Sequence, residues 1–168
     1  MTPGKSNIFE QVVNYFADDE WDFSQIENQQ KLVIEYKNGQ GYEWQIVAKV
    51  EEVITSAKII FSSRIPESAS IGGAYFNRVG EFFHRINSSQ IEVGNFELDY
   101  NRGLAYCRTS IKINPMIINS EEVIEYLIND LLYDNIRLMN QYLDGIKAVA
   151  QGKLDPEEAQ MRGRVGYY

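Results

Sequence analysis

The side chains that could do chemistry in this chain are few and far apart in the sequence. The 168 residues include one histidine, His84, and one cysteine, Cys107. A lone cysteine excludes an internal disulfide and a zinc site of several thiolates, and a lone histidine leaves no second imidazole for a metal. No nucleophile motif accompanies His84, and Cys107 alternates with apolar residues, so we interpret both as structural. We therefore expect a protein that is not an enzyme, with no catalytic residue, metal or cofactor.

Three further motifs have an ordinary structural interpretation. An acidic run without the spaced ligands and central glycine of a calcium loop is interpreted as a solvated turn: Asp18, Asp19, Glu20 and Asp22. Gly72-Gly73 lacks the lysine and Ser/Thr of a phosphate-binding loop. The segment Arg162–Tyr168 offers only two arginines to a single-stranded nucleic acid, and we interpret it as a flexible tail.

The overall charge excludes two classes of partner. Sixteen Lys+Arg against 24 Asp+Glu give a net charge of −8. Such a chain is repelled by nucleic-acid phosphates and by anionic membranes, so we expect neither as a partner. No apolar stretch approaches the roughly 18 residues of a membrane span, and the first residues lack the apolar core of a signal peptide. We expect a cytoplasmic protein.

Hydrophobic periodicity predicts the elements that position these side chains. Apolar residues recur every three to four positions in three segments and every second position in the others. The prediction is an α+β domain over residues 1–160, followed by a flexible tail over 161–168. Its elements are a helix from Ser6 to Ala17, four strands in an antiparallel meander (Trp21–Glu27, Lys31–Lys37, Tyr42–Val50, Val53–Ser62), a helix at Ala74–Ile86, a hairpin (Ile91–Tyr100, Leu104–Ile113) and a long helix at Ser120–Gln151.

Several boundaries rest on local signals. Ser6 is the expected N-cap of the first helix, and Glu51-Glu52 is the expected turn between the third and fourth strands. Asn119 with Glu122 resembles a capping box, and Gly152 is a suitable residue just past the end of the long helix. That helix would be about 48 Å long. A globule of this size is only about 40 Å across, so the helix must overhang, bend or break, with a kink expected where its apolar stripe lapses at Asp134-Asn135.

The long helix is apolar over a wider arc than one sheet face covers. Such a helix is either buried on two sides within the chain or completed by another chain, and we favour the second alternative. The predicted partner interface consists of Ile128, Leu132, Ile136, Met139, Leu138 and Tyr142. This interface would support a homodimer or the binding of a partner protein.

Four stretches resemble a known family. Gly94–Asp99 followed by a turn and Tyr106–Ile111, together with the helix end Glu81–Asn87 and the later Pro156–Ala159, are similar to the YbjN-like family, whose members are labelled as candidate bacterial sensory transduction regulators. The resemblance spans about Ile8 to Ala159. It implies a fold like that of the type III secretion chaperones, whose members commonly dimerise and bind extended segments of client proteins, and it implies no catalytic residue. The segment Ser68–Gly73 departs from the family pattern, where a charged helical start is expected.

Two functions follow as expectations. The first is a non-enzymatic protein-interaction module, chaperone-like or regulatory, that binds a client or partner protein as a homodimer. The alternative is a small-molecule-binding sensory domain whose aromatic pocket lies between sheet and helices and is lined by Trp21, Tyr36, Trp44 and Tyr106.

Overall fold

The described part of the chain forms one six-stranded antiparallel sheet with four helices. The computed structural model describes residues 7–26, 28–53, 55–66, 75–114 and 120–165. In chain order the elements are α1 (Ile8–Asp18), β1 (Phe23–Ile26), β2 (Lys31–Lys37), β3 (Glu43–Val53), β4 (Ser56–Arg64), α2 (Phe76–Ser89), β5 (Asn95–Asp99), β6 (Leu104–Ile113), α3 (Glu121–Ala150) and α4 (Pro156–Val165). The α+β class and the predicted order of elements are confirmed. At Asp155–Glu158, where an N-cap residue followed by proline favours a short terminal turn, the chain forms the ten-residue helix α4.

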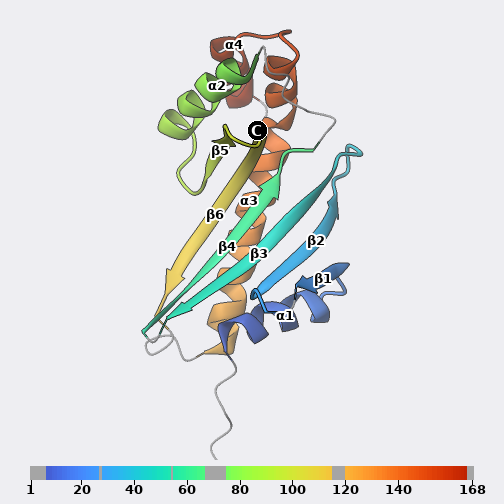
Figure 1. Cartoon of the computed structure of the whole chain (residues 1–168), viewed down its shortest axis with the longest axis vertical. Coiled ribbons are helices and arrows are strands. Elements are labelled where there is room, and N and C mark those ends of the chain that lie inside the picture. Colours follow the sequence, from blue (N-terminus) through green and yellow to red (C-terminus); the bar gives the residue numbers. More distant parts are fainter. Residues whose placement is uncertain (1–6, 27, 54, 67–74, 115–119, 166–168) are drawn as a thin grey trace, which may run out of the picture.

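The sheet is a meander with a hairpin added at one side. Its strand order is β1-β2-β3-β4-β6-β5, so that β4 pairs with β6 while β5 forms the far edge. The helix α3 runs behind the sheet along the long axis of the molecule, α1 lies beside it at one end, and α2 and α4 gather around its last turns (Figure 1). The helices therefore leave the opposite face of the sheet open.

The core lies between the sheet and the helices. Alternate residues of the central strands point into it, among them Ile46 and Ala48 of β3 and Ile59 and Phe61 of β4, each 0–1% exposed. Phe16 of α1 packs edge-on against Phe61 with ring centroids 6.1 Å apart. The period-two pattern of the strands therefore reports a sheet with one buried and one solvated face.

Two local boundaries differ from the prediction. The N-cap of α1 is Asn7, whose Oδ1 accepts from the Glu10 amide at 2.7 Å while Glu10 Oε2 accepts from the Asn7 amide at 3.2 Å, which completes a capping box. The predicted turn at Glu51-Glu52 is wrong, because both residues continue the β3–β4 ladder opposite Lys58 and Ala57. Ser6 lies outside the described residues.

The long helix is continuous. α3 spans 30 residues, about 45 Å at 1.5 Å per residue, and no kink interrupts it at Asp134-Asn135. Its N-cap is Ser120 and not Asn119, which lies outside the described residues. Gly152, with φ +69°, follows the last turn as predicted. The molecule is elongated, so the helix fits along its length (Figure 1).

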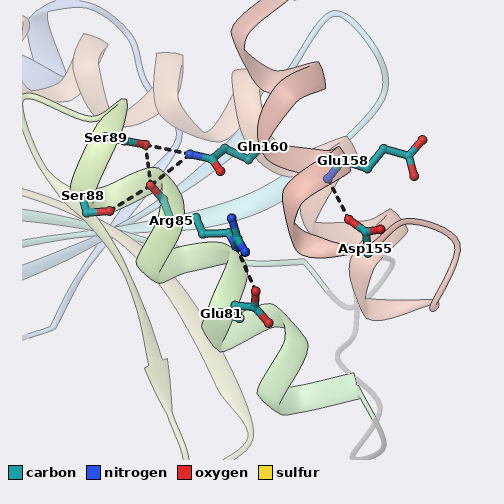
Figure 2. A network of polar contacts seen from close by, with 7 residues as sticks. All are labelled: Glu81, Arg85, Ser88, Ser89, Asp155, Glu158 and Gln160. Carbon is teal, nitrogen blue, oxygen red and sulfur yellow. Dashed lines mark hydrogen bonds and ion pairs between the residues drawn. The ribbon is translucent and has the colours of Figure 1, made fainter.

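Residues that the sequence assigns to a flexible tail form part of α4. The Asp155 carboxylate caps this helix by accepting from the Glu158 amide at 2.8 Å, and the side-chain amide of Gln160 donates to Ser89 Oγ of α2 at 2.8 Å (Figure 2). Ala159 is 1% exposed between the helices. The helix extends to Val165, five residues beyond the predicted end of the domain. Its contacts to α2 and α3 join residues that are far apart in the sequence, so no local pattern predicts its length.

Candidate functional site

The predicted interface residues of α3 lie in the core of this chain. Ile128, Leu132, Leu138, Met139 and Tyr142 are each 0–2% exposed, and Ile136 is partly buried against the same cluster. The sheet covers one side of the helix, while α1, α2 and α4 cover neighbouring sides. The wide apolar arc is therefore buried by four elements of the same chain. In the folded monomer these six side chains do not form a surface patch, which corrects their predicted placement.

The lapse in the apolar stripe of α3 is a buried polar network. Asn135 is 0% exposed, and its Nδ2 donates to the carbonyl oxygens of Phe61 and Cys107, each at 3.2 Å. Its Oδ1 accepts from the Ser63 hydroxyl at 2.5 Å, and Ser63 Oγ accepts from Trp44 Nε1 at 3.1 Å. Every side-chain polar group in this chain of contacts has a partner, so the network anchors α3 to β4 and β6 and is not poised to react.

The side chains of the predicted aromatic pocket do not line one cavity. Trp21 stacks on Tyr36 with centroids 6.1 Å apart, and Tyr36 meets Trp44 at 4.7 Å, so three rings pack against one another on the helix side of the sheet. Tyr106 follows the buried Ala105 on β6 and points to the opposite face. The predicted grouping of all four residues is therefore wrong, because adjacent residues of a strand face opposite sides.

His84 and Cys107 are in separate places. His84 is exposed on α2, whereas Cys107 is 0% exposed on β6, and burial raises the pKa of its thiol well above the usual range. Such a thiol is a poor nucleophile. Among the residues that the structure describes, no three His, Cys, Asp or Glu side chains gather as metal ligands. No described helix combines the length and the apolar character that crossing a membrane requires.

One face of the sheet is left uncovered by the described helices. It is formed by the alternate residues that point away from α3, and none of them is fully buried: Ser24 and Ile26 of β1; Lys31, Val33, Glu35 and Lys37 of β2; Glu43, Gln45, Val47, Lys49, Glu51 and Val53 of β3; Ser56, Lys58, Ile60, Ser62 and Arg64 of β4; Asn95, Glu97 and Asp99 of β5; Leu104, Tyr106, Arg108, Ser110 and Lys112 of β6. We call this surface the open face.

Basic side chains are concentrated on the open face. It carries seven of the 16 Lys+Arg of the chain and five of its 24 Asp+Glu, so it is basic on a chain of net charge −8. Three of the cations are paired there: Lys37 with Glu43 at 2.7 Å, Lys49 with Glu51 at 2.5 Å, and Arg108 with Glu97 at 3.1 Å. Within the described ranges, the other four form no ion pair: Lys31, Lys58, Arg64 and Lys112.

The strand register explains why sequence analysis missed this surface. The alternation within β3 and β6 already separated the basic from the apolar positions, for example Lys49 from Ala48 and Lys112 from Ile113. Only the register brings Lys112 opposite Lys58, because β4 and β6 are separated by α2 and β5 in the chain. The alternation of each strand predicts that its basic residues point away from the core, but it does not predict that basic residues of different strands lie side by side.

A second, smaller surface follows the outward side of α3. Val123, Tyr126 and Tyr133 are 45%, 65% and 70% exposed, and Asp130 and Arg137 complete the same row at steps of three and four residues. We call these five residues the α3 seam. Arg137 forms an ion pair with Asp134 at 2.9 Å.

A groove also opens between α3, α4 and the β2–β3 turn. It encloses about 450 Å³ and is lined by Gln40, Phe82, Asn140, Gln141, Tyr142, Asp144, Gly145, Ala148, Leu154, Ala159, Arg162 and Gly163. Its polar rim is already engaged: Asn140 Oδ1 accepts from Asn38 Nδ2 at 2.9 Å, and Asp144 Oδ1 accepts from the Tyr42 hydroxyl at 2.6 Å. The hydrogen bond to Asp144 raises the pKa of Tyr42 to about 12.

Comparisons with known proteins give a structural likeness but no match by sequence. No family model matches the chain, and no curated protein matches it. The fold is similar to the crystal structure of YbjN, described as "a putative transcription regulator from E. coli", with 13% sequence identity over 90% of this chain and 95% of that chain and a TM-score of 0.48. A solved structure of the family that the sequence resembles is therefore among the structural neighbours. At this identity and TM-score we derive no activity from it.

Proposed function

We propose that this chain is a non-enzymatic protein-interaction module that binds its partner on the open face of the sheet. The observation that supports the proposal is the uncovered face itself, where Val33, Val47 and Ile60 stay partly exposed between charged side chains. A sheet of six strands with helices on one side presents a broad, rigid surface, which suits the burial of roughly 800 Å² per partner that is typical of specific interfaces. A regulatory or chaperone-like role for this binding remains part of the proposal.

A pair of matched variants tests the proposal. Val47→Asp/Ile60→Asp places two charges in the middle of the open face, whereas Tyr100→Asp/Met161→Asp makes the same change at exposed residues outside it. Native mass spectrometry of tagged protein from its own host should show a second polypeptide at defined stoichiometry with the wild type and the control variant. The open-face variant should lose that polypeptide while its circular dichroism is unchanged. Retention of the polypeptide by the open-face variant would contradict the proposal.

We further propose that two copies associate through the α3 seam, because this row is self-complementary. When two α3 helices lie antiparallel with their Tyr133 rings near the symmetry axis, Asp130 of one copy faces Arg137 of the other, and the two Tyr126 residues flank them. Exposed tyrosines are frequent in interfaces because each buries a large area at little conformational cost. This placement replaces the buried residues from which the sequence predicted a dimer.

A further inference from the structure

Two pairs of lysines face each other directly across neighbouring strands of the open face. Lys31 of β2 is opposite Lys49 of β3, and Lys58 of β4 is opposite Lys112 of β6. Side chains directly opposite in an antiparallel ladder are about 5 Å apart at Cβ, and like charges there are destabilising. Glu51 forms an ion pair with Lys49 at 2.5 Å and also lies opposite Lys58, so a single carboxylate serves both pairs. Lys31, Lys58 and Lys112 form no ion pair among the described residues.

Aliphatic side chains lie beside the two lysine pairs. Val33 is opposite Val47, and Ile60 is opposite Lys49 on the next strand, so the three form a short diagonal strip across β2, β3 and β4. They are partly exposed. Both lysine pairs lie along one side of the strip, because Lys31 and Lys49 are two residues along their strands from Val33 and Val47, and Lys58 is two residues from Ile60 in the same direction. A ligand that fits this arrangement has anionic groups along one side of an apolar strip.

We propose that the open face binds an acidic protein segment, with carboxylates on the pairs Lys31/Lys49 and Lys58/Lys112 and apolar side chains on the strip of Val33, Val47 and Ile60. This inference rests on the proposed function and specifies the chemistry of the partner. Glu51 alone cannot neutralise four lysines, so carboxylates of the segment relieve the repulsion that remains within the lysine pairs.

A protein segment fits better than a nucleic acid for two reasons. The open face also carries carboxylates, including Glu35 and Glu51, which repel a continuous row of phosphates. The rest of the chain is strongly acidic and repels a long polyanion that extends beyond the sheet. A short segment of alternating acidic and aliphatic residues has a lower charge density than a row of phosphates and need not extend beyond the sheet, so both repulsions are weaker for it.

The test uses a synthetic fluorescent peptide of alternating glutamate and valine, twelve residues long, with a single-stranded DNA of twelve nucleotides as the competing class. Fluorescence anisotropy should show saturable peptide binding at 50 mM NaCl that weakens at least tenfold at 500 mM. Lys58→Glu/Lys112→Glu should weaken binding at least tenfold. The matched control Lys153→Glu/Arg164→Glu, which changes two exposed cations off the sheet, should stay within twofold of wild type.

The melting temperature distinguishes relief of the repulsion between Lys58 and Lys112 from damage to the fold. Lys112→Glu alone turns a repulsive pair into an attractive one with Lys58, so the Tm of the unbound protein should rise by about 1–3 °C while peptide affinity falls. A fall in both would indicate damage to the fold and would overturn the inference. Tighter binding of the DNA than of the peptide would also overturn it, as would equal effects of the two charge-reversal variants.

The two double variants distinguish a wrong partner chemistry from a wrong interface. If the host polypeptide is lost with Val47→Asp/Ile60→Asp but retained with Lys58→Glu/Lys112→Glu, the open face is the interface and its partner is not acidic. If both variants retain the polypeptide, the proposed function fails as well.

Discussion

Asn135 holds α3 to the sheet through a buried polar network, so its replacement should lower stability. Its side chain makes three buried hydrogen bonds to β4 and β6, and Asn135→Leu would leave the Ser63 hydroxyl and two carbonyl groups with one partner fewer. We expect the free energy of unfolding to fall by about 2–4 kcal/mol, since each buried polar group left unsatisfied costs about 1–3 kcal/mol. Urea denaturation measures the change. Asn129→Leu on the same helix breaks one contact, from Tyr15 Oη at 2.8 Å, and should cost about 1 kcal/mol. If the two variants lose the same free energy of unfolding, the buried network around Asn135 contributes no more than a single, partly buried hydrogen bond.

Cys107 gives the protein a defined dependence on alkaline pH. Burial raises the pKa of the folded thiol, so the unfolded chain releases its proton first, near pH 8.5. The stabilisation is complete below that pH and is lost as the pH rises above it, with a limiting slope of about 1.4 kcal/mol per pH unit. Denaturation curves between pH 7.5 and 10 should show this decline, and Cys107→Ala should remove most of it. An identical slope in the variant would assign the decline to other groups.

At the residue scale, sequence analysis succeeds where a side chain obeys its local pattern. The alternation along β6 predicted a buried Cys107, and the structure confirms its burial. Asn135 was interpreted as a weak point of the helix because it interrupts the apolar stripe. Its hydrogen-bond partners lie 28 and more than 70 residues away in the chain, so the buried network was not predicted. A polar residue within an apolar stripe indicates either a break or a buried network, and the local sequence does not distinguish them.

At the scale of elements, α4 depends on close approach to α3. A Cβ at Gly163 would lie 2.9 Å from the Tyr142 ring, so Gly163→Val should push α4 away from the helices it covers. We expect faster tryptic cleavage at Lys153 and Arg162, and little change in the circular dichroism of the remaining chain. Gly39→Val is the matched control, because no atom lies within 4 Å of its added Cβ. Unchanged cleavage of Gly163→Val would show that α4 tolerates the larger side chain in place.

The strands and α3 were predictable because their signals are local. For α4 only the start was predictable, from Asp155 as an N-cap followed by Pro156 and Glu158, and its length was not. Period-two alternation placed β2 and β6 to the residue, and the helical stripe placed α3 within one residue at each end. The boundary between β3 and β4 was misplaced because Glu51 and Glu52 favour turns by composition, yet the ladder continues through them. Gln160 and Ala159 dock α4 through contacts to α2 and α3 that no window of sequence contains.

At the scale of the whole molecule, the proposed dimer makes a charge-swap prediction. Arg137→Asp or Asp130→Arg alone should each weaken self-association by roughly fivefold or more, because like charges then meet across the two-fold axis. The double variant should restore it. Analytical ultracentrifugation measures the dissociation constant, and Met161→Asp, an exposed residue off the seam, is the control. Two single variants that dimerise as well as wild type would place the interface elsewhere.

The wide apolar arc of α3 shows why a surface is hard to infer from one helix. The sequence counts apolar positions around the helix but not how many neighbours of the same chain will cover them. Here α1, α2, α4 and the sheet all pack on α3, so the residues predicted to face a partner face the core. The open face became visible only once six strands were placed side by side, because its charges come from five different strands.

Lysine labelling tests most directly whether a partner covers the open face. Tagged protein is reductively methylated in a gentle extract of its own host, and again after purification away from every other polypeptide. Mass spectrometry then compares each lysine in the two states. The account predicts that Lys31, Lys58 and Lys112 are several-fold less reactive in the extract, while Lys153, which is exposed outside the sheet, is equally reactive in both. Equal reactivity of the three open-face lysines in the two states, or protection confined to Lys153, would contradict it.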